Sequence, residues 1–447
     1  MSTTVRREAD SFLEQFERFE RQAKHPSWVF PLRKAGIARF AELGFPTVDQ
    51  EDWRFTNVAP IARLPFKPVL EPTGEAPAAD AISRSPFGRL AAIRLVFING
   101  HYTKELSSPP PPAEGITISS LAEALASNAP ALEPRLGRYA AQESNAFAAL
   151  NTAFFQDGAF IHVEAGRQLQ RPVHLLYIST LKETGATFHP RNLIIAEENS
   201  RATIVESYAA TQDSACFTNA VTELAAGESA VLEHIKFQDE TRSAFHIAAI
   251  YARLGSHSNV VLHSIATGAK LSRNDIRTTL AGEGLECILN GLYLTGGSQL
   301  ADHHMVVEHA EPNCRSHEYF NGILDGRSKG VFHGRILVRP AGQKTDAKQT
   351  NKNLLLSDEA TVDTKPQLEI YADDVKCTHG ATVGQLNEES IFYLRSRGIG
   401  AGRARRMLIH AFAGEILERI RHAPAREELS QRIWHHLEAN PHLANSK

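Results

Sequence analysis

Hydrophobic positions near the start of the chain recur at helical spacing. In SFLEQFERFERQA, three phenylalanines fall near one face of a helix, namely Phe12, Phe16 and Phe19. PLRKAGIARFAEL continues the pattern, and its apolar side is predicted at Leu32, Ala35 and Leu43. The first 65 residues are therefore predicted to form a small helical region.

The helical pattern stops after Pro65. The next stretch, FKPVLEPTGEAPAADAISRSP, is rich in Pro and Ala without an apolar period, which is typical of a linker or a loose surface segment. We predict helices and a linker over residues 1–90. A mixed segment over residues 91–159 follows, in which Asn99 and Gly100 stand between β-prone runs and favour a type I′ hairpin turn, and a helix is expected from Ala146.

From residue 160 to 386 the chain consists of short β-prone runs separated by turn residues, such as NLIIAEENSRATIVES and VTELAAGESAVLEHIKF. The predicted turn centres recur every 26 to 32 residues, at Arg167, Asn199, Glu228, His257 and Glu283. Repeated strands and turns without intervening helices favour a solenoid of stacked β-coils, in which each coil buries its apolar side against its neighbours. A β-sandwich is the alternative, since it also contains short, evenly spaced strands.

A polar run near the end of this region alternates with period two. In QTNKNLLLS, Gln349, Asn351 and Asn353 project from the same side of a strand. In stacked coils such amides can form a ladder, whereas in a solvated edge strand they would face water. The residues do not separate these two interpretations.

Helical spacing returns after residue 386. ARRMLIHAFAGEILERI carries an apolar stripe, predicted at Met407, Phe412, Ile416 and Ile420, and REELSQRIWHHLEA forms another amphipathic segment. Residues 387–447 are therefore predicted to form a helical C-terminal domain.

Charge and hydropathy limit the classes of function. Forty-eight basic and 51 acidic residues give a formal charge of −3, so no global charge favours nucleic acid or an anionic membrane. The chain has no apolar run typical of a signal peptide or a membrane span. We expect a cytoplasmic protein with a small-molecule or protein partner.

The chain contains four cysteines, at positions 216, 287, 314 and 377, and none forms a C-x-x-C pair. This spacing excludes a disulfide scaffold and a self-contained all-cysteine metal site. Any metal would require histidine or ligands from a partner.

One cysteine and one histidine stand close together in ADDVKCTHG. In a strand, Cys377 and His379 project from the same side with Cα atoms about 6.5 to 7 Å apart, so they could share a metal only near a strand end. Gly380 could end the strand there. Spacing alone nevertheless favours a core cysteine beside a histidine at the rim, because two ligands are half a coordination shell.

The other candidate motifs give weaker indications of function. Cys314 and His317 have C-x-x-H spacing without a second pair, which favours a structural loop. Three further histidines, His303, His304 and His309, are interpreted mostly as surface or partner-facing residues. GIGAGR at 398–403 has no strand after its helix and is interpreted as a helix–helix turn. No phosphate-binding loop and no Ser-His-Asp set is recognisable, so the residues indicate no catalytic centre.

The block QKTDAKQTNKNLLLSDEATVDTKPQLEIYADDVKCTHGATVGQLNEESIFYLRSRGI resembles the signature region of the SufB/SufD family of iron-sulfur cluster assembly scaffolds. EDWRFT, VFINGHY and AFAALNTAFFQDG resemble further family segments, so the likeness covers about nine-tenths of the chain. The SufB branch carries extra N-terminal cysteines, whereas this chain has none before Cys216, so it is more similar to the SufD branch.

The resemblance implies a right-handed parallel β-helix between helical terminal domains. It also implies a non-enzymatic scaffold that pairs with a SufB-type paralogue and binds a SufC-type ATPase. No cofactor is expected to be permanently bound, because a transient iron-sulfur cluster would form at the interface with the paralogue. A homodimer is plausible when the paralogue is absent.

The resemblance further suggests site residues. His379 matches the histidine that contributes to the interface cluster and would be the metal ligand, and Cys377 is its companion in the same motif. The C-terminal helices match the region that docks the ATPase, where the predicted contacts are Arg403, Arg405, Arg406 and Phe412. The alternatives are a β-helical carbohydrate-active enzyme, disfavoured by its scattered carboxylates, and a SufB-like scaffold that holds a cluster independently.

Overall fold

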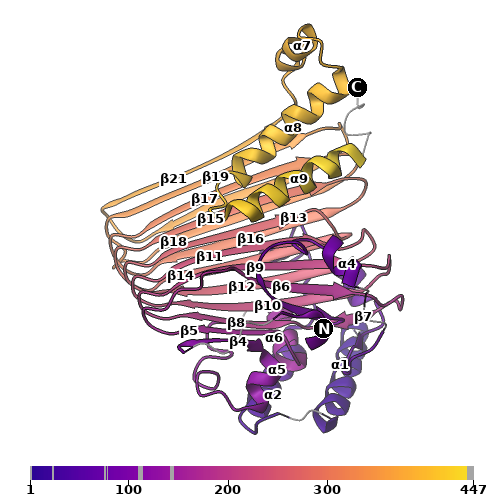
Figure 1. The fold of residues 1–447 in the computed structure, drawn as a ribbon, viewed down its shortest axis with the longest axis vertical. Coiled ribbons are helices and arrows are strands. Elements are labelled where there is room, and N and C mark those ends of the chain that lie inside the picture. Colours follow the sequence, from indigo (N-terminus) through magenta and orange to yellow (C-terminus); the bar gives the residue numbers. More distant parts are fainter. Residues whose placement is uncertain are drawn as a thin grey trace.

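The computed structural model describes residues 3–22, 25–74, 77, 79–108, 114–140 and 145–439. Within this part of the chain, eight successive strand pairs wind into a parallel β-helix (Figure 1). The first pair is β5 (Ala159–Val163) and β6 (Val173–Ser179), and the last is β20 (Thr361–Ile370) and β21 (Val375–Gly384). The predicted β-solenoid is confirmed, and the β-sandwich alternative is wrong.

Each strand pairs with the equivalent strand of the next coil, which produces two long parallel sheets. The first sheet continues from β5 through β8 (Arg191–Ala196), β10 (Phe217–Ala226), β12 (Phe245–Leu254), β14 (Leu271–Leu280), β16 (Leu300–His309) and β18 (Lys329–Val338) to β20. The second continues from β6 through β9 (Arg201–Ala210), β11 (Val231–Asp239), β13 (Asn259–Ala266), β15 (Glu286–Thr295), β17 (Arg315–Leu324) and β19 (Thr345–Leu355) to β21.

The coils turn through residues with left-handed backbone conformation. On one side of the helix these are Gly166, Asn199, Ser229, His257 and Gly284, with φ between 55° and 71°. Every turn centre predicted from the sequence lies within one residue of such a position. Glycine and asparagine adopt this conformation at low cost, which explains why polar and glycine residues recur at this interval.

The interior of the β-helix is apolar in most coils but also contains buried ionisable residues with polar partners. Lys236 is fully buried, and its Nζ donates to Asn274 Oδ1 at 2.5 Å and lies 2.8 Å from His246 Nε2. Glu206 lies 2.9 Å from His234 Nε2. A buried charge without a partner would be costly, so each of these groups is held by a neighbouring polar side chain.

The amide run on β19 also points inward. Gln349, Asn351 and Asn353 are 1 to 3% exposed, so the solvated edge strand is wrong. The three amides stand in register above Glu318, Phe320 and Gly322, none of which is an amide, so a ladder of like side chains does not form either. Instead, the three side chains fill part of the interior and form polar contacts there, such as the hydrogen bond from Tyr293 Oη to Asn353 Oδ1 at 2.5 Å.

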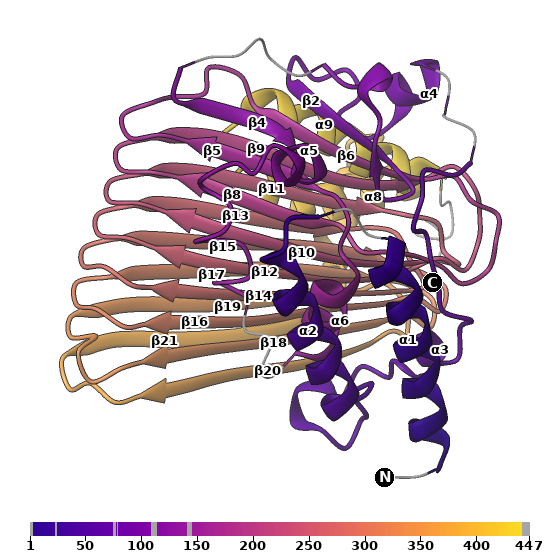
Figure 2. The same cartoon turned by 90° about the horizontal axis from the view of Figure 1, so that it is seen from below.

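Helices cover the outer face of the first sheet at the start of the β-helix (Figure 2). They are α1 (Thr3–Gln22), α2 (Val29–Leu43) and α6 (Ala146–Phe154). Phe12, Phe16 and Phe19 pack in one aromatic cluster, as their spacing predicts. On α2, however, the buried side is formed by Val29, Arg33, Gly36, Ile37 and Phe40, whereas Ala35 is exposed. The predicted stripe is therefore wrong at Ala35, whereas Leu32 and Leu43 are partly buried against neighbouring apolar clusters. Gly36 is buried because α6 approaches α2 there, and a Cβ at that position would lie 2.9 Å from Ala149 O.

The segment Glu51–Thr56, which includes the short helix η1 (Glu51–Trp53), anchors the N-terminal region to the first sheet. The Arg273 guanidinium lies 3.7 Å from the centre of the Trp53 ring and donates to Asp52 O at 2.8 Å. Thr56 Oγ1 donates to Asp302 Oδ2 at 2.6 Å. These contacts give the EDWRFT element a structural role, because they connect it to β14 and β16.

The segment predicted as a linker is partly structured. β1 (Lys67–Pro68) pairs with β7 (Ala186–Phe188), α4 (Ala79–Arg84) follows, and Phe87 is fully buried against the outer face of the second sheet. Residues 75, 76 and 78 lie outside the described part of the chain.

The following segment supplies the first edges of both sheets. β2 (Ile93–Ile98) and β3 (His101–Tyr102) form the predicted hairpin, with φ of 51° at Asn99 and 88° at Gly100, and β2 pairs with β6. β4 (Ile116–Ser120) runs antiparallel to β5. The remaining short helices here are α3 (Ala59–Ala62), η2 (Lys104–Leu106) and α5 (Leu121–Ala126).

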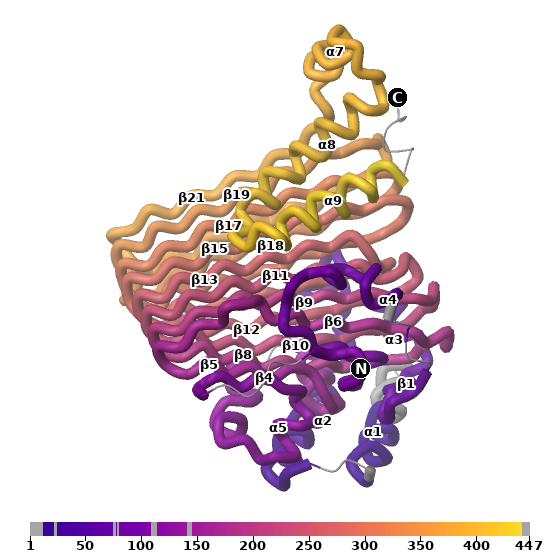
Figure 3. The backbone as a smooth tube through the Cα atoms, viewed as in Figure 1, coloured from indigo at the N-terminus to yellow at the C-terminus, as the bar shows by residue number. Residues whose placement is uncertain are grey.

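The C-terminal helices are α7 (Glu388–Ser396), α8 (Ala401–Leu417) and α9 (Ala423–Ala439). α8 and α9 pack on the outer face of the second sheet through residues such as Ile409, Ile416, Leu429 and Ile433, whereas α7 projects beyond the last coil (Figure 3). The predicted helix–helix turn at GIGAGR is confirmed between α7 and α8. None of the described helices is both long and apolar enough to cross a membrane.

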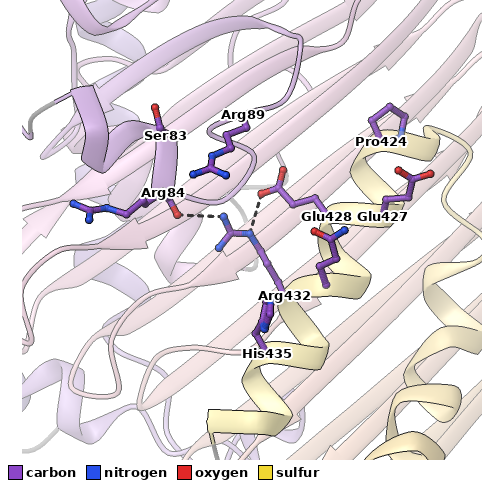
Figure 4. A pocket seen from close by; sticks show the side chains of 9 residues that line it. Ser83, Arg84, Arg89, Pro424, Glu427, Glu428, Arg432 and His435 are labelled. Atoms are coloured by element: carbon purple, nitrogen blue, oxygen red, sulfur yellow. Dashed lines mark hydrogen bonds and ion pairs between the residues drawn. The ribbon is translucent and has the colours of Figure 1, made fainter.

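A cavity of about 460 Å³ lies between the segment around α4 and α9 (Figure 4). Its lining contains both signs of charge, and its central arginine, Arg432, is bound by Glu428 at 2.9 Å and donates to Ser85 O at 2.7 Å. Glu428 also accepts from Phe87 N at 2.5 Å. These contacts connect the N-terminal segment to α9, which indicates a structural junction.

Candidate functional site at the open end of the β-helix

The last coil of the β-helix is not covered by another layer of the described chain. β20 and β21 are the terminal strands of the two sheets, so each has one edge without a strand partner among the described residues. Large apolar side chains are exposed here: Ile370 is 39%, Tyr371 61% and Val383 50% exposed. Free strand edges beside exposed apolar groups are typical of a surface that pairs with another chain.

Cys377 and His379 lie on this last coil. They stand in register above Ala347 and Gln349, both of which face the interior, so their side chains lie on the inner side of β21. His379 is exposed, whereas Cys377 is half-buried against Ile336 and Val338. The expected strand end at Gly380 is wrong, because β21 continues to Gly384. Within the described part of the chain no further coil covers this side of β21, which leaves His379 exposed and Cys377 partly exposed.

The two groups differ as ligands. Burial raises the pKa of the Cys377 thiol, and the nearby Asp346 carboxylate raises it further, although a backbone hydrogen bond at Ala347 opposes both. A thiol must lose its proton to bind a metal, so this environment disfavours Cys377 as a ligand in the isolated chain. His379, in contrast, is exposed.

A cavity of about 430 Å³ opens beside the beginning of β21. It is lined by residues of both signs, namely Asn313, Arg315, Lys344, Thr345, Asp346, Asp374, Val375 and Lys376. Mixed charge of this kind does not select one class of ligand. Its relevance lies in its position, because Val375 is two residues before Cys377 on the same side of the strand.

The other cysteines are structural. Cys216, Cys287 and Cys314 are buried, and burial raises the pKa of each thiol, to about 11 for Cys216. Cys314 belongs to the interior core and its Sγ donates to Gly282 O at 3.1 Å, whereas His317 lies 3.9 Å from Asp346 and is partly exposed. The two residues do not converge, which agrees with the structural interpretation of their spacing.

The prediction that His303, His304 and His309 are surface residues is wrong. All three are at most 4% exposed. His303 stacks on Tyr293 in the interior, and His309 Nε2 lies 2.8 Å from Ser316 Oγ. His304 lies on the opposite side of the strand, and the sequence could not show that the Glu51–Thr56 segment covers it, with Asp52 Oδ1 3.7 Å from His304 Nε2.

His304, His333 and Asp52 form a group that sequence reasoning missed, with potential ligand atoms within 4.8 Å of one another. Arg273 Nη2 donates to His304 Nδ1 at 2.8 Å, so the neutral ring carries its proton on Nε2, 3.7 Å from Asp52. Burial, and then the Arg273 charge, hold the pKa of His304 well below its ordinary value. A protonated ring nitrogen and a neighbouring guanidinium both disfavour the binding of a cation. We therefore interpret the three residues as part of the contact that anchors the N-terminal segment.

The predicted partner-binding residues lie on α8. Arg403 is exposed and Arg405 and Arg406 are half-buried. Phe412 packs partly against the second sheet, and its carbonyl accepts from Asn321 Nδ2 at 3.0 Å. Two residues that were not predicted, Phe392 and Tyr393 on α7, are 73% and 56% exposed, so much of the exposed aromatic surface of this region lies on α7.

Together these features define a parallel β-helix with an exposed histidine at the end that no further described coil covers. Two family models match the chain: the SufBD protein N-terminal region over residues 7–175, and the core domain described as SUF system FeS cluster assembly, SufBD core domain, over residues 178–412. The chain belongs to the SufBD family.

Similarity to individual proteins supports the same family. An iron-sulfur cluster assembly SufBD family protein of Synechocystis sp. is 35% identical over 89% of both chains. The iron-sulfur cluster assembly protein SufD of Escherichia coli is 32% identical over 91% of this chain and 93% of its own. The chloroplastic protein ABCI7 of Arabidopsis thaliana is 27% identical over 91% and 86%.

Proposed function

We propose that this chain is a SufD-type, non-enzymatic scaffold of a SUF iron-sulfur cluster assembly complex. It pairs with a SufB-type paralogue through its last coil, and the nascent cluster is built at that interface as cargo. Membership of the SufBD family and similarity to SufD support this role. The observation that carries it is the exposed His379 on the inner side of an uncovered terminal coil.

In this arrangement His379 supplies an imidazole and the paralogue supplies a thiolate. Neither side alone completes a coordination shell, which accounts for the isolated Cys-x-His spacing. Cys377 has a secondary part, because burial and Asp346 favour its protonated form. Ile370, Tyr371 and Val383 provide the apolar contacts of the pairing surface.

The test is co-expression with SufB-type and SufC-type partners, followed by purification and measurement of iron and acid-labile sulfide. His379→Ala is expected to leave the complex intact and to lower cluster content by about tenfold or more. His317→Ala, which removes a partly exposed histidine from the outer face of the second sheet, is the matched control. Undiminished cluster in an intact His379→Ala complex would overturn the assignment.

We also propose that the C-terminal helices bind the SufC-type ATPase. Support comes from the exposed Arg403 and from the exposed aromatic residues of α7, Phe392 and Tyr393. Arg403→Glu is expected to reduce ATPase co-purification without changing SufB-type pairing. Arg54→Glu, an exposed arginine of the N-terminal region, is the charge-matched control. If Arg403→Glu and Phe392→Ser both recover as much ATPase as Arg54→Glu does, this docking surface is contradicted.

A further inference from the structure

A polar column lies directly beneath His379. Glu318, Gln349 and His379 occupy the same register on three successive strands of the second sheet, and their side chains lie on its inner side. Adjacent strands are about 4.8 Å apart, so each side chain is the neighbour of the next. The column becomes apolar one coil deeper, where Leu289 is in register with Glu318. The polar residues are thus confined to the open end.

Gln349 is held in one place. It is 1% exposed, and its Nε2 donates to Glu318 Oε2 at 2.5 Å. Gly334 makes room for the amide, because a Cβ at that position would lie 2.1 Å from Gln349 Nε2. A glycine in the middle of a strand is unfavourable unless something must approach the backbone closely.

This arrangement leaves a hydrogen-bond acceptor unused. Gln349 Oε1 is buried and accepts no hydrogen bond from the described residues. A buried acceptor without a donor destabilises the fold, because it has lost its hydrogen bonds to water. The next side chain above it in the column is His379, whose ring carries an N–H in the neutral form.

A histidine that binds a metal through one nitrogen normally donates its other N–H to a fixed acceptor, which sets the tautomer and orients the ring. We propose that Gln349 is the positioning residue for His379: its Oε1 accepts the imidazole N–H and leaves the other ring nitrogen free for the interface cluster. Glu318 and Gly334 hold the amide in place. This inference rests on the proposed function of His379.

The ordinary alternative is that the column only fills the interior. Asn353 provides the comparison, because it is an equally buried inward amide on β19 but lies four residues further along the strand. A filling role predicts that loss of either amide has the same effect on His379. A positioning role predicts an effect from Gln349 alone.

The experiment uses the full chain labelled with ¹⁵N-histidine, and long-range ¹H–¹⁵N correlation spectra assigned with His379→Ala. Where the imidazole is neutral, Gln349→Leu is expected to shift the His379 tautomer ratio by about threefold or more, the effect of losing one hydrogen bond. Gln349→Glu retains an acceptor oxygen and is expected to preserve the preference. Asn353→Leu is the matched control, and thermal unfolding of each variant verifies folding.

An unchanged His379 tautomer in folded Gln349→Leu overturns the positioning role. If that variant does not fold, Gln349→Met, with its flexible side chain, replaces it under the same criterion. The outcome is separable from that of the proposed function. Full cluster content in the His379→Ala complex removes the ligand role, whereas an altered tautomer in the isolated Gln349→Leu chain still supports the contact between Gln349 and His379.

Discussion

The two ends of the β-helix are built differently. At the first end, α1, α2 and α6 cover the outer face of the first sheet, and the strands β5 and β6 are almost entirely buried. At the other end, β21 is exposed along most of its length. A parallel coil buries its apolar side only against neighbours, so a covered end supports the fold and an uncovered end is available for a partner.

Buried ionisable residues also differ between the covered end and the open end of the β-helix. At the covered end Arg191 and Glu223, both fully buried, form an ion pair at 2.6 Å. Near the open end Glu318 is buried with an amide as its hydrogen-bond partner, and burial raises its pKa to about 8. The covered end is therefore expected to determine stability, and the open end to determine association and pH dependence.

The largest expected effect is at the covered end. Arg191→Met leaves the Glu223 carboxylate buried without its cation and should lower the free energy of unfolding by about 3 kcal/mol. Urea denaturation measures the change. The double variant Arg191→Met, Glu223→Gln should recover part of it, and a loss below about 0.5 kcal/mol in the single variant would contradict this role of the pair.

The second effect concerns pH. The pKa of Glu318 in the folded chain, about 8, lies above that of an unfolded glutamate, so the folded state binds the extra proton. The stability that Glu318 contributes is therefore fully present below about pH 4.5 and is lost as the pH rises through 8, by at most about 5 kcal/mol. Glu318→Gln should flatten this part of the curve of unfolding free energy against pH. If the curve of Glu318→Gln has the same shape as that of the unsubstituted chain, Glu318 does not titrate in this pH range.

The third effect separates association from stability. Val383→Lys places a charge on the exposed apolar surface of the last coil and should weaken pairing, with the SufB-type paralogue or with a second copy, by about tenfold or more. The free energy of unfolding should change by less than about 0.5 kcal/mol. Analytical ultracentrifugation measures the first quantity. Thr378→Ala, on the outer side of the same strand, is the control, and equal pairing by both variants would exclude this surface.

The smallest effect tests what holds the last coil in place. Lys329 and Asp363 form a partly exposed ion pair at 2.7 Å between β18 and β20. Its removal in Lys329→Met should cost no more than about 1 kcal/mol in urea denaturation, because backbone hydrogen bonds connect the strands along their length. A larger loss of stability would mean that the ion pair between the side chains, and not the backbone hydrogen bonds, holds β20 in place.

Much of the fold could be predicted because it depends on local chemistry. Turn residues that adopt left-handed conformations recur at Asn199 and His257, and helical spacing of phenylalanines indicates α1. The buried side of α2 could not be predicted, since it depends on how closely α6 approaches Gly36. Likewise the sequence does not show that the histidines of β16 are buried. His303 and His309 face the interior of the β-helix, whereas the Glu51–Thr56 segment covers His304.

The sequence by itself determined the repeat of strands, the type of each terminal region and the common side of Cys377 and His379, because these properties depend on spacing along one strand or helix. Tertiary structure alone decided that the last coil stays uncovered, that Cys377 is half-buried while His379 is exposed, and that Gln349 lies beneath His379 with Glu318 below it. These relations join residues about 30 positions apart, and their register is set by the stacking of whole coils.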